Sequence, residues 1–409
     1  MSEGRLWWFG RGNVNASASD AFDVFDEMIE GDSAPIDRSI GAGPVDDIKW
    51  ALDLSRIIVG TQGSELSIRS SSLDEPITRA NFNFRGPSTQ GSGDVDAIKI
   101  DNRGMFVQRS DVRLYELSVD DRVTYDYGSL DMMALVPEIG YPVIKRLGVQ
   151  RQPDTRIHCV RGDGKVAILV SEPAEEVLFW ILYETDGFVE EVDVLPGPLE
   201  DRVYYTVRRE VNGETVRYRE RWSQENECRG GTVSRCADSH ILYSGTNSDI
   251  LGDLEHLEGK EVVVWGDGKD LGSYTVENGS IRLSEPASEI VVGLKYTAQF
   301  KSAKLQYAAA AGTALTQKKT FAHVGLVLAD THWQGLRFGL SFDDDQLEDL
   351  PCIGEEEEEI EEHTVFDLTD VHKLPVEHGW TTDSRLCLEA CAPRPCTVLA
   401  CVIDQQTNG

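Results

Sequence analysis

The sequence has few basic residues: 39 lysines and arginines stand against 71 aspartates and glutamates, which gives a formal net charge of −32. Binding to nucleic acid by phosphate neutralisation needs Lys and Arg, so this deficit argues against that class of protein. The chain also lacks a run of 18 apolar residues, which argues against a membrane-spanning helix. Its first residues, Met1–Arg5, lead into strand-like sequence and not into a signal peptide. We therefore expect a strongly anionic protein that is assembled in cytoplasm.

Sequence motifs of the common enzyme classes are absent too. None of the eight histidines belongs to a His-Glu-x-x-His pattern, and no Gly-x-Ser-x-Gly elbow is present. Carboxylates are so numerous that any pair chosen for glycoside hydrolysis would be arbitrary. No constellation passes the first stage of an active-site search. The sequence therefore predicts no enzyme activity, no cofactor and no bound metal.

The cysteines offer one apparent metal cluster near the C-terminus. Cys387, Cys391, Cys396 and Cys401 are four, five and five residues apart, which does not fit the paired knuckles of a structural zinc site. On alternating strands such thiols are small buried hydrophobes. Cys228 and Cys236 flank a Gly-rich loop, and nothing in the sequence requires them to pair. Without a secretory signal we interpret all eight cysteines as reduced thiols.

What is present is a repeat. Five times, at steps of about 50 residues, an apolar strand runs into a polar turn and out again. The five segments are residues 6–12, 57–66, 105–114, 157–166 and 203–214. One hairpin per period of this length is typical of propeller blades, in which each blade buries its apolar face against its neighbours. The alternative is a β-sandwich with evenly spaced hairpins.

Patterns of helical period are scarce, and the one at residues 19–29 is short and fits an exposed loop equally well. Alternating strands bounded by Gly, Asn and Asp prevail, with Asn212-Gly213 and Asn278-Gly279 as the strongest hairpin turns. We predict a mostly β chain with a propeller-like domain of repeated β-hairpins followed by small β-barrel or sandwich modules. The expected domains are the propeller-like domain at 1–227, a small inserted β-module at 228–306 and a C-terminal sandwich-like domain at 307–409.

An acidic run lies inside the C-terminal domain. It consists of Glu355, Glu356, Glu357, Glu358 and Glu359. Like charges this close repel one another, which predicts a solvated loop. A divalent-cation site is the weaker interpretation, because the spacing matches no defined calcium loop.

Several blocks resemble the tail nozzle proteins of short-tailed bacteriophages, also called second tail tubular proteins. Residues 149–164 combine a Gln-x-x-Pro-Asp turn, a strand and an Asp-Gly hairpin, and residues 192–221 are similar to the family's next block with its Arg-Tyr-x-Glu closing strand. Further blocks resemble the family at residues 5–10, 58–65, 106–110, 256–262 and 379–387. The resemblance covers nearly the whole chain, and its motifs are structural turns. Family members carry a further N-terminal region, whereas this chain begins within the pattern, which leaves its place in the tail open.

The resemblance implies a structural virion protein in the tail. Six copies would form a tube that contacts the tail adaptor and the fibres or spikes, and genomic DNA would pass through the lumen during ejection without specific binding. Closed rings of this kind use heterologous contacts. An anionic wall fits such a lumen because it does not retain DNA. The Glu355–Glu359 run is the candidate for a lumenal or constricting loop.

The alternative function is a propeller-type tail protein that binds a receptor or polysaccharide, or another head-to-tail connector component. A sugar-binding face would show exposed aromatic side chains beside carboxylates. The eight tryptophans are spread across the blocks instead, which favours core packing.

Overall fold

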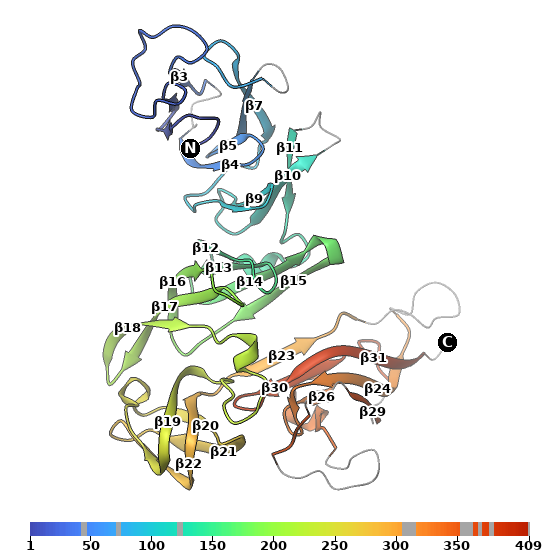
Figure 1. Cartoon of the computed structure of the whole chain (residues 1–409). Coiled ribbons are helices and arrows are strands. Elements are labelled where there is room, and N and C mark those ends of the chain that lie inside the picture. Colours follow the sequence, from blue (N-terminus) through green and yellow to red (C-terminus); the bar gives the residue numbers. More distant parts are fainter. Residues whose placement is uncertain are drawn as a thin grey trace. The chain divides into compact units, whose positions relative to one another are not determined.

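The computed structural model describes residues 1–41, 47–70, 75–120, 126–304, 316–351, 363–366, 370–375 and 380–407. Within these ranges the chain forms antiparallel sheets and short 3-10 turns, with no α-helix, and therefore no helix that could cross a membrane. It divides into two compact units, residues 1–209 with 217–222 and residues 210–216 with 223–409 (Figure 1). The predicted mostly β fold is confirmed.

Unit 1 contains five consecutive sheets, each an antiparallel meander in chain order. The first sheet has β1 (Trp7–Phe9), β2 (Asn13–Ala16) and β3 (Ile36–Ser39), and the second has β4 (Ile48–Asp53), β5 (Ile57–Thr61), β6 (Glu65–Ser70) and β7 (Phe82–Ser88). The third has β8 (Ile98–Ile100), β9 (Arg103–Val107), β10 (Leu114–Asp120) and β11 (Asp126–Asp131). The fourth has β12 (Ile144–Gln150), β13 (Arg156–Arg161), β14 (Val166–Glu172) and β15 (Val177–Tyr183), and the fifth has β16 (Phe188–Leu195), β17 (Arg202–Val211) and β18 (Glu214–Arg221).

The five predicted hairpins occupy equivalent positions in these sheets. Their first strands begin at residues 7, 57, 103, 156 and 202, so the intervals are 50, 46, 53 and 46 residues. Asn212 and Gly213 both have positive φ, 52° and 79°, as a two-residue Asn-Gly hairpin turn requires. The propeller-like repeat is thus confirmed, whereas among the described residues no hydrophobic core joins the first sheet to the fifth.

Each sheet packs face to face on the next one, and a separate hydrophobic core fills each interface. Val14 and Val59 belong to the core between the first and second sheets, and Trp50 packs with Phe106 between the second and third. Met105 and Leu169 share the core between the third and fourth sheets. A further core, around Tyr205, joins the fourth sheet to the fifth. Strands such as β5 and β14 are buried at consecutive positions and not only at alternate ones, which gives the inner sheets two buried faces.

The two terminal sheets of unit 1 have three strands, whereas the three inner sheets have four. If the repeated hairpin defines the second and third strands, the first sheet lacks a first strand and the fifth lacks a fourth. β1 and β18 are edge strands of the terminal sheets in the described part of the chain, as the outer strands of the inner sheets are of theirs. An edge of this kind exposes backbone N–H and C=O groups that can pair with another strand.

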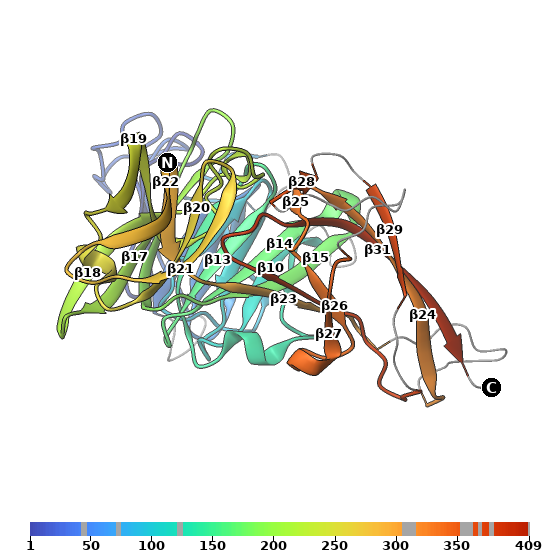
Figure 2. The same ribbon diagram turned by 90° about the horizontal axis from the view of Figure 1, so that it is seen from below.

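Unit 2 holds four sheets among its described residues (Figure 2). One contains β19 (Asp238–Leu251), β20 (Glu261–Gly266), β21 (Lys269–Thr275) and β22 (Ile281–Leu294) around a core that includes Val264 and Val292. A second contains β23 (Thr297–Lys301), β26 (Arg337–Gly339), β27 (Leu347–Asp349) and β30 (Cys387–Cys391). The others pair β24 (Lys319–Ala329) with β29 (Asp370–Pro375) and β31 (Thr397–Thr407), and β25 (Thr331–His332) with β28 (Val365–Phe366). Because β23 pairs with β30, the chain enters the C-terminal sheets at Thr297.

The segment at residues 19–29 is a loop of turns between β2 and β3, not a helix. The buried guanidinium of Arg5 holds the chain on both sides of this loop by donating to the carbonyl oxygens of Ser17, Ala34 and Asp32 at 2.7, 2.8 and 2.8 Å. One arginine thus satisfies three backbone acceptors, which is how an irregular loop of this length is held against a sheet.

Candidate functional site

The predicted acidic site falls outside the described residues. Glu355, Glu356, Glu357, Glu358 and Glu359 lie within 352–362, so their position as a lumenal loop remains a prediction. Among the C-terminal cysteines Cys387 is buried in β30 and Cys401 is exposed on β31. Within the described ranges no three His, Cys, Asp or Glu side chains are placed to hold a metal ion.

Cys228 and Cys236 do lie together, as free thiols. The Cys236 thiol donates to the carbonyl oxygen of Cys228 at 3.4 Å, and the two sulfurs interact across the loop that joins them. The hydrogen bond from the Cys228 thiol lowers the pKa of Cys236 to about 7 in spite of burial, while the pKa of Cys228 rises. This is the one close thiol pair that the loop sequence suggested.

The tryptophans largely follow the prediction of core packing, with two exceptions. Trp50 and Trp265 are buried, and the side chain of Trp180 packs between sheets with its indole N–H donating to the Met132 carbonyl at 3.0 Å. Trp8 and Trp380, however, are 61% and 46% exposed. The prediction is therefore wrong for Trp8, because strand alternation turns Trp7 and Phe9 into the core and Trp8 to the opposite face.

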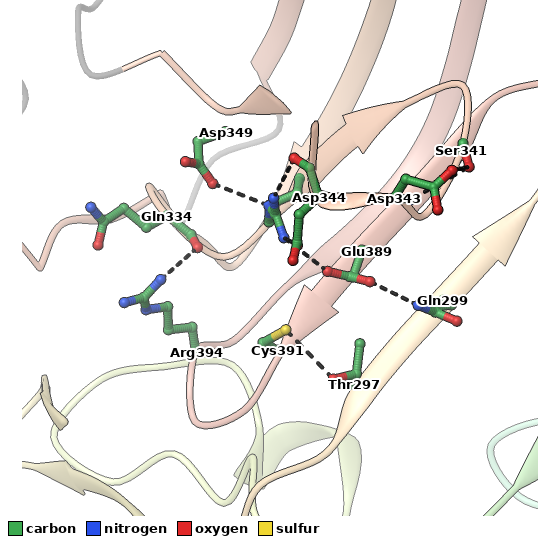
Figure 3. Close-up of polar contacts among 11 residues, drawn as sticks. Thr297, Gln299, Gln334, Ser341, Asp343, Asp344, Asp349, Glu389, Cys391 and Arg394 are labelled. Carbon is green, nitrogen blue, oxygen red and sulfur yellow. Dashed lines mark hydrogen bonds and ion pairs between the residues drawn. The ribbon is translucent and has the colours of Figure 1, made fainter. Parts of the chain in front are cut away.

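Three carboxylates, Asp344, Asp349 and Glu389, surround the guanidinium of Arg337 in the C-terminal sheet (Figure 3, where the three carboxylates are labelled). Its guanidinium lies 3.1 Å from Asp344, 3.3 Å from Glu389 and 3.6 Å from Asp349, and Gln299 donates to Glu389 at 2.8 Å. Burial opposes the charge on Arg337, but the three carboxylates together raise its pKa. This arrangement, in which all three carboxylates face the same cation, links strands β23, β26, β27 and β30.

The surface that stands out is strand β15, the edge strand of the fourth sheet. Its sequence is Val-Leu-Phe-Trp-Ile-Leu-Tyr, and five of these seven side chains are exposed: Val177, Leu178, Phe179, Ile181 and Leu182. A long exposed apolar edge is uncommon in a protein that stays monomeric, since it promotes association. In a chain with 71 acidic residues its exposure is all the more unusual.

The repeat explains the exposure of the odd-numbered side chains of β15. Tyr183 packs with Tyr205 of the fifth sheet at a ring distance of 5.5 Å, so the odd-numbered side chains of β15 face that sheet. The fifth sheet ends at β18 and has no fourth strand to lie opposite β15. Phe179 and Ile181 therefore project past the edge of the fifth sheet. We call the apolar side chains at 177, 179 and 181 the β15 ledge.

No protein-family model matches the chain, and no curated protein matches it. Among solved structures it is similar to a glycoside hydrolase family 43 arabinoxylan arabinofuranohydrolase from Bacillus subtilis, solved in complex with cellotetraose. The identity is 10%, the alignment covers 99% of this chain and 95% of that chain, and the TM-score is 0.23.

This comparison corrects one prediction. The sequence predicted that the chain is not an enzyme, but the similar solved structure is a glycoside hydrolase, and we withdraw that prediction. At this identity and TM-score the likeness carries no argument about the chemistry of the chain, so no hydrolase activity is inferred from it either.

Proposed function

We propose that the chain is a structural subunit of the tail nozzle of a short-tailed phage and that copies form a homo-hexameric ring around a channel for genome ejection. The resemblance of the blocks at 149–164 and 192–221 supports this proposal. The observation that carries the assembly part is the β15 ledge, because an apolar strand exposed on so anionic a chain is stable in water once another subunit covers it.

The charge of the chain fits the same role. A net charge of −32 gives the surface a strongly negative potential. An anionic duplex between anionic walls is repelled from every side, within about 8 Å of the wall at physiological salt. In this proposal the tail adaptor and the fibres or spikes are the neighbours, and DNA passes without specific binding.

Two measurements test the proposal. Sedimentation and negative-stain microscopy of the purified chain should show closed rings. Amide hydrogens of residues 177–183 should exchange more slowly in the ring than in dissociated subunits, because the edge becomes buried. A chain that stays monomeric at every concentration reached, or rings in which 177–183 exchange as fast as in the monomer, would refute the proposal.

The alternative, a tail protein that binds polysaccharide, finds support in the exposure of Trp8 beside acidic side chains. A glycan array with the wild-type chain and Trp8→Ala tests it. Binding of a defined glycan that is lost in the variant would favour this alternative.

A further inference from the structure

The outer face of the first sheet carries a pocket of aromatic and acidic side chains. Trp8, Asn15 and Asp37 are paired across β1, β2 and β3, so their side chains form one row on the face that points away from the second sheet. The loop between β2 and β3 adds Phe25 and Glu27 to the same pocket, which has a volume of about 380 Å³. A pocket of this size accommodates a side chain of another molecule or a small ligand.

The described side chains that line this pocket include two carboxylates, Glu27 and Asp37, and no basic group. Residues 12–37 contain seven carboxylates and no lysine or arginine. Arg79 donates to the backbone carbonyl of Glu27 at 3.1 Å, and Arg38 donates to the backbone carbonyl of Asp37 at 3.2 Å, so both contacts are with the main chain. Arg5 ties the two ends of the loop together by donating to the carbonyl oxygens of Ser17 and Ala34. An aromatic wall beside carboxylates suits a cation, and Trp gives the strongest cation–π attraction.

The outer face of the fifth sheet has the opposite character. Val203, Tyr205 and Val207 face the fourth sheet, so alternation turns Tyr204 and Arg208 outward. Arg217 and Arg219 of β18 lie on this outer face as well. The Arg219 guanidinium lies 4.7 Å from the centre of the Tyr204 ring.

These three arginines contact two carboxylates. Arg208 and Arg217 share Glu190, at 3.3 and 2.6 Å, and Arg219 is 3.7 Å from Asp193. The hydrogen bond from Arg217 lowers the pKa of Glu190, so that carboxylate stays ionised. The side chains of Arg217 and Arg219 remain 61% and 58% exposed. The face therefore presents a local excess of guanidinium groups on a chain that is otherwise strongly acidic.

We propose that the outer face of the fifth sheet of one copy docks on the outer face of the first sheet of the next copy, and that Arg217 or Arg219 enters the Trp8 pocket. This inference rests on the proposed ring and names its subunit contact. Every sheet-to-sheet interface inside unit 1 is a face-to-face contact with its own core, and this contact continues that series between copies. The two faces differ, so the contact is heterologous and closes into a ring or continues as a filament.

Each of the two faces also has exposed apolar side chains beside it. The β15 ledge projects beside the fifth sheet, and the loop of the first sheet exposes Phe22 and Met28 next to the pocket, 40% and 86% exposed. In the docked pair these groups cover one another while the arginines meet Glu27 and Asp37. Arg and Trp are the residues most enriched where single side chains dominate an interface.

A charge-swap experiment tests this contact on the full chain. Variant A, Arg217→Glu with Arg219→Glu, makes both end faces acidic, and variant B, Glu27→Arg with Asp37→Arg, makes both basic. Each variant alone should sediment as a monomer, because like charges meet in every contact. An equimolar mixture should assemble with A and B alternating, which native mass spectrometry detects as equal numbers of the two masses. Circular dichroism and thermal melts confirm that both variants fold, as expected for exposed side chains.

Trp8→Ala provides a second arm, with Trp380→Ala as the matched control at another exposed tryptophan. The dissociation constant of assembly should rise at least about tenfold for Trp8→Ala and stay unchanged for Trp380→Ala. If the wild type assembles and A and B alone assemble equally well, the end-face contact is wrong while the proposed ring survives. If the wild type is monomeric, the ring fails first. Failure of the folded A and B mixture to assemble would also overturn the contact, as would unchanged assembly of Trp8→Ala.

Discussion

His158 is completely buried between the fourth and fifth sheets, where it is held as a neutral imidazole. Its Nδ1 is 2.7 Å from the Tyr205 hydroxyl, and its Nε2 is 3.4 Å from the Gln150 amide oxygen. Because an amide oxygen only accepts, Nε2 carries the proton and the Tyr205 hydroxyl donates to Nδ1. Burial first, and the charge of Arg156 second, lower the pKa of His158 to about 3.

This predicts a pH dependence of stability. Between pH 6.5, the ordinary pKa of an unfolded histidine, and about 3 the unfolded chain binds a proton that the folded chain does not, so stability falls as the pH is lowered. The loss for one group approaches about 1.4 kcal/mol per pH unit below 6.5. We would measure the free energy of unfolding in urea at pH 7.5, 6.5, 5.5 and 5.0. Below pH 6.5 this free energy should fall with decreasing pH less steeply in His158→Gln than in the wild type, by this amount. Equal slopes would show that His158 is protonated in the folded state.

Gly60 illustrates a second residue-scale constraint. A Cβ at this position would lie 2.1 Å from Cε2 of Trp50 and 2.6 Å from the Ser92 hydroxyl, because the indole lies directly on the backbone of β5. Gly60→Ala should therefore lower the free energy of unfolding by about 1–3 kcal/mol. In Gly86→Ala, in the same sheet, the new methyl would meet Leu66 at an ordinary 3.6 Å, and stability should be unchanged or slightly higher. Chemical denaturation of both variants tests this, and equal effects would contradict the packing.

At the scale of elements, one ion pair ties β17 to β18. Arg209 is 3% exposed and pairs with both oxygens of Glu220 at 2.7 Å, while also donating to the Asp186 carbonyl. Glu220→Gln removes the carboxylate that pairs with this buried guanidinium through two hydrogen bonds and should cost about 3–5 kcal/mol. Arg209→Met with Glu220→Leu removes both charges and should cost less than either single change. A double-mutant cycle in urea measures this, and additive losses would argue against direct coupling.

Some elements of the structure could be predicted from the sequence pattern and others could not. Residues 19–29 have several apolar side chains at helix-like spacing, yet they form a loop of turns. The Arg5 guanidinium holds the chain on either side of this loop by donating to the carbonyl oxygens of Ser17 and Ala34. The Asn-Gly turns were predictable, since their positive φ values follow from the residues themselves. The exposure of β15 was not predictable, because its sequence is that of a buried strand.

At the scale of the whole molecule, the charge of −32 sets the response to salt. Net repulsion among carboxylates destabilises the compact state, and the Debye length shrinks from about 30 Å at 0.01 M to about 3 Å at 1 M. The melting temperature should therefore rise with NaCl and level off as screening becomes complete. Glycerol at equal osmolality serves as the control and should not reproduce the steep low-salt part of the curve. A melting temperature that does not change with NaCl concentration would mean that local ion pairs, such as that of Arg337 with Asp344, already offset the repulsion among the carboxylates.

The sequence by itself determined the β class, the period near 50 residues and the position of every repeated hairpin, because alternation and turn chemistry are local properties of consecutive residues. Only the tertiary structure decided which strands lack a neighbour. The missing fourth strand of the fifth sheet, the outward row of Trp8 with Asp37, and the arginines of β18 on the opposite end face all depend on register and on which sheet lies next to which. A pattern of period two gives two faces to every strand but does not say which face stays uncovered.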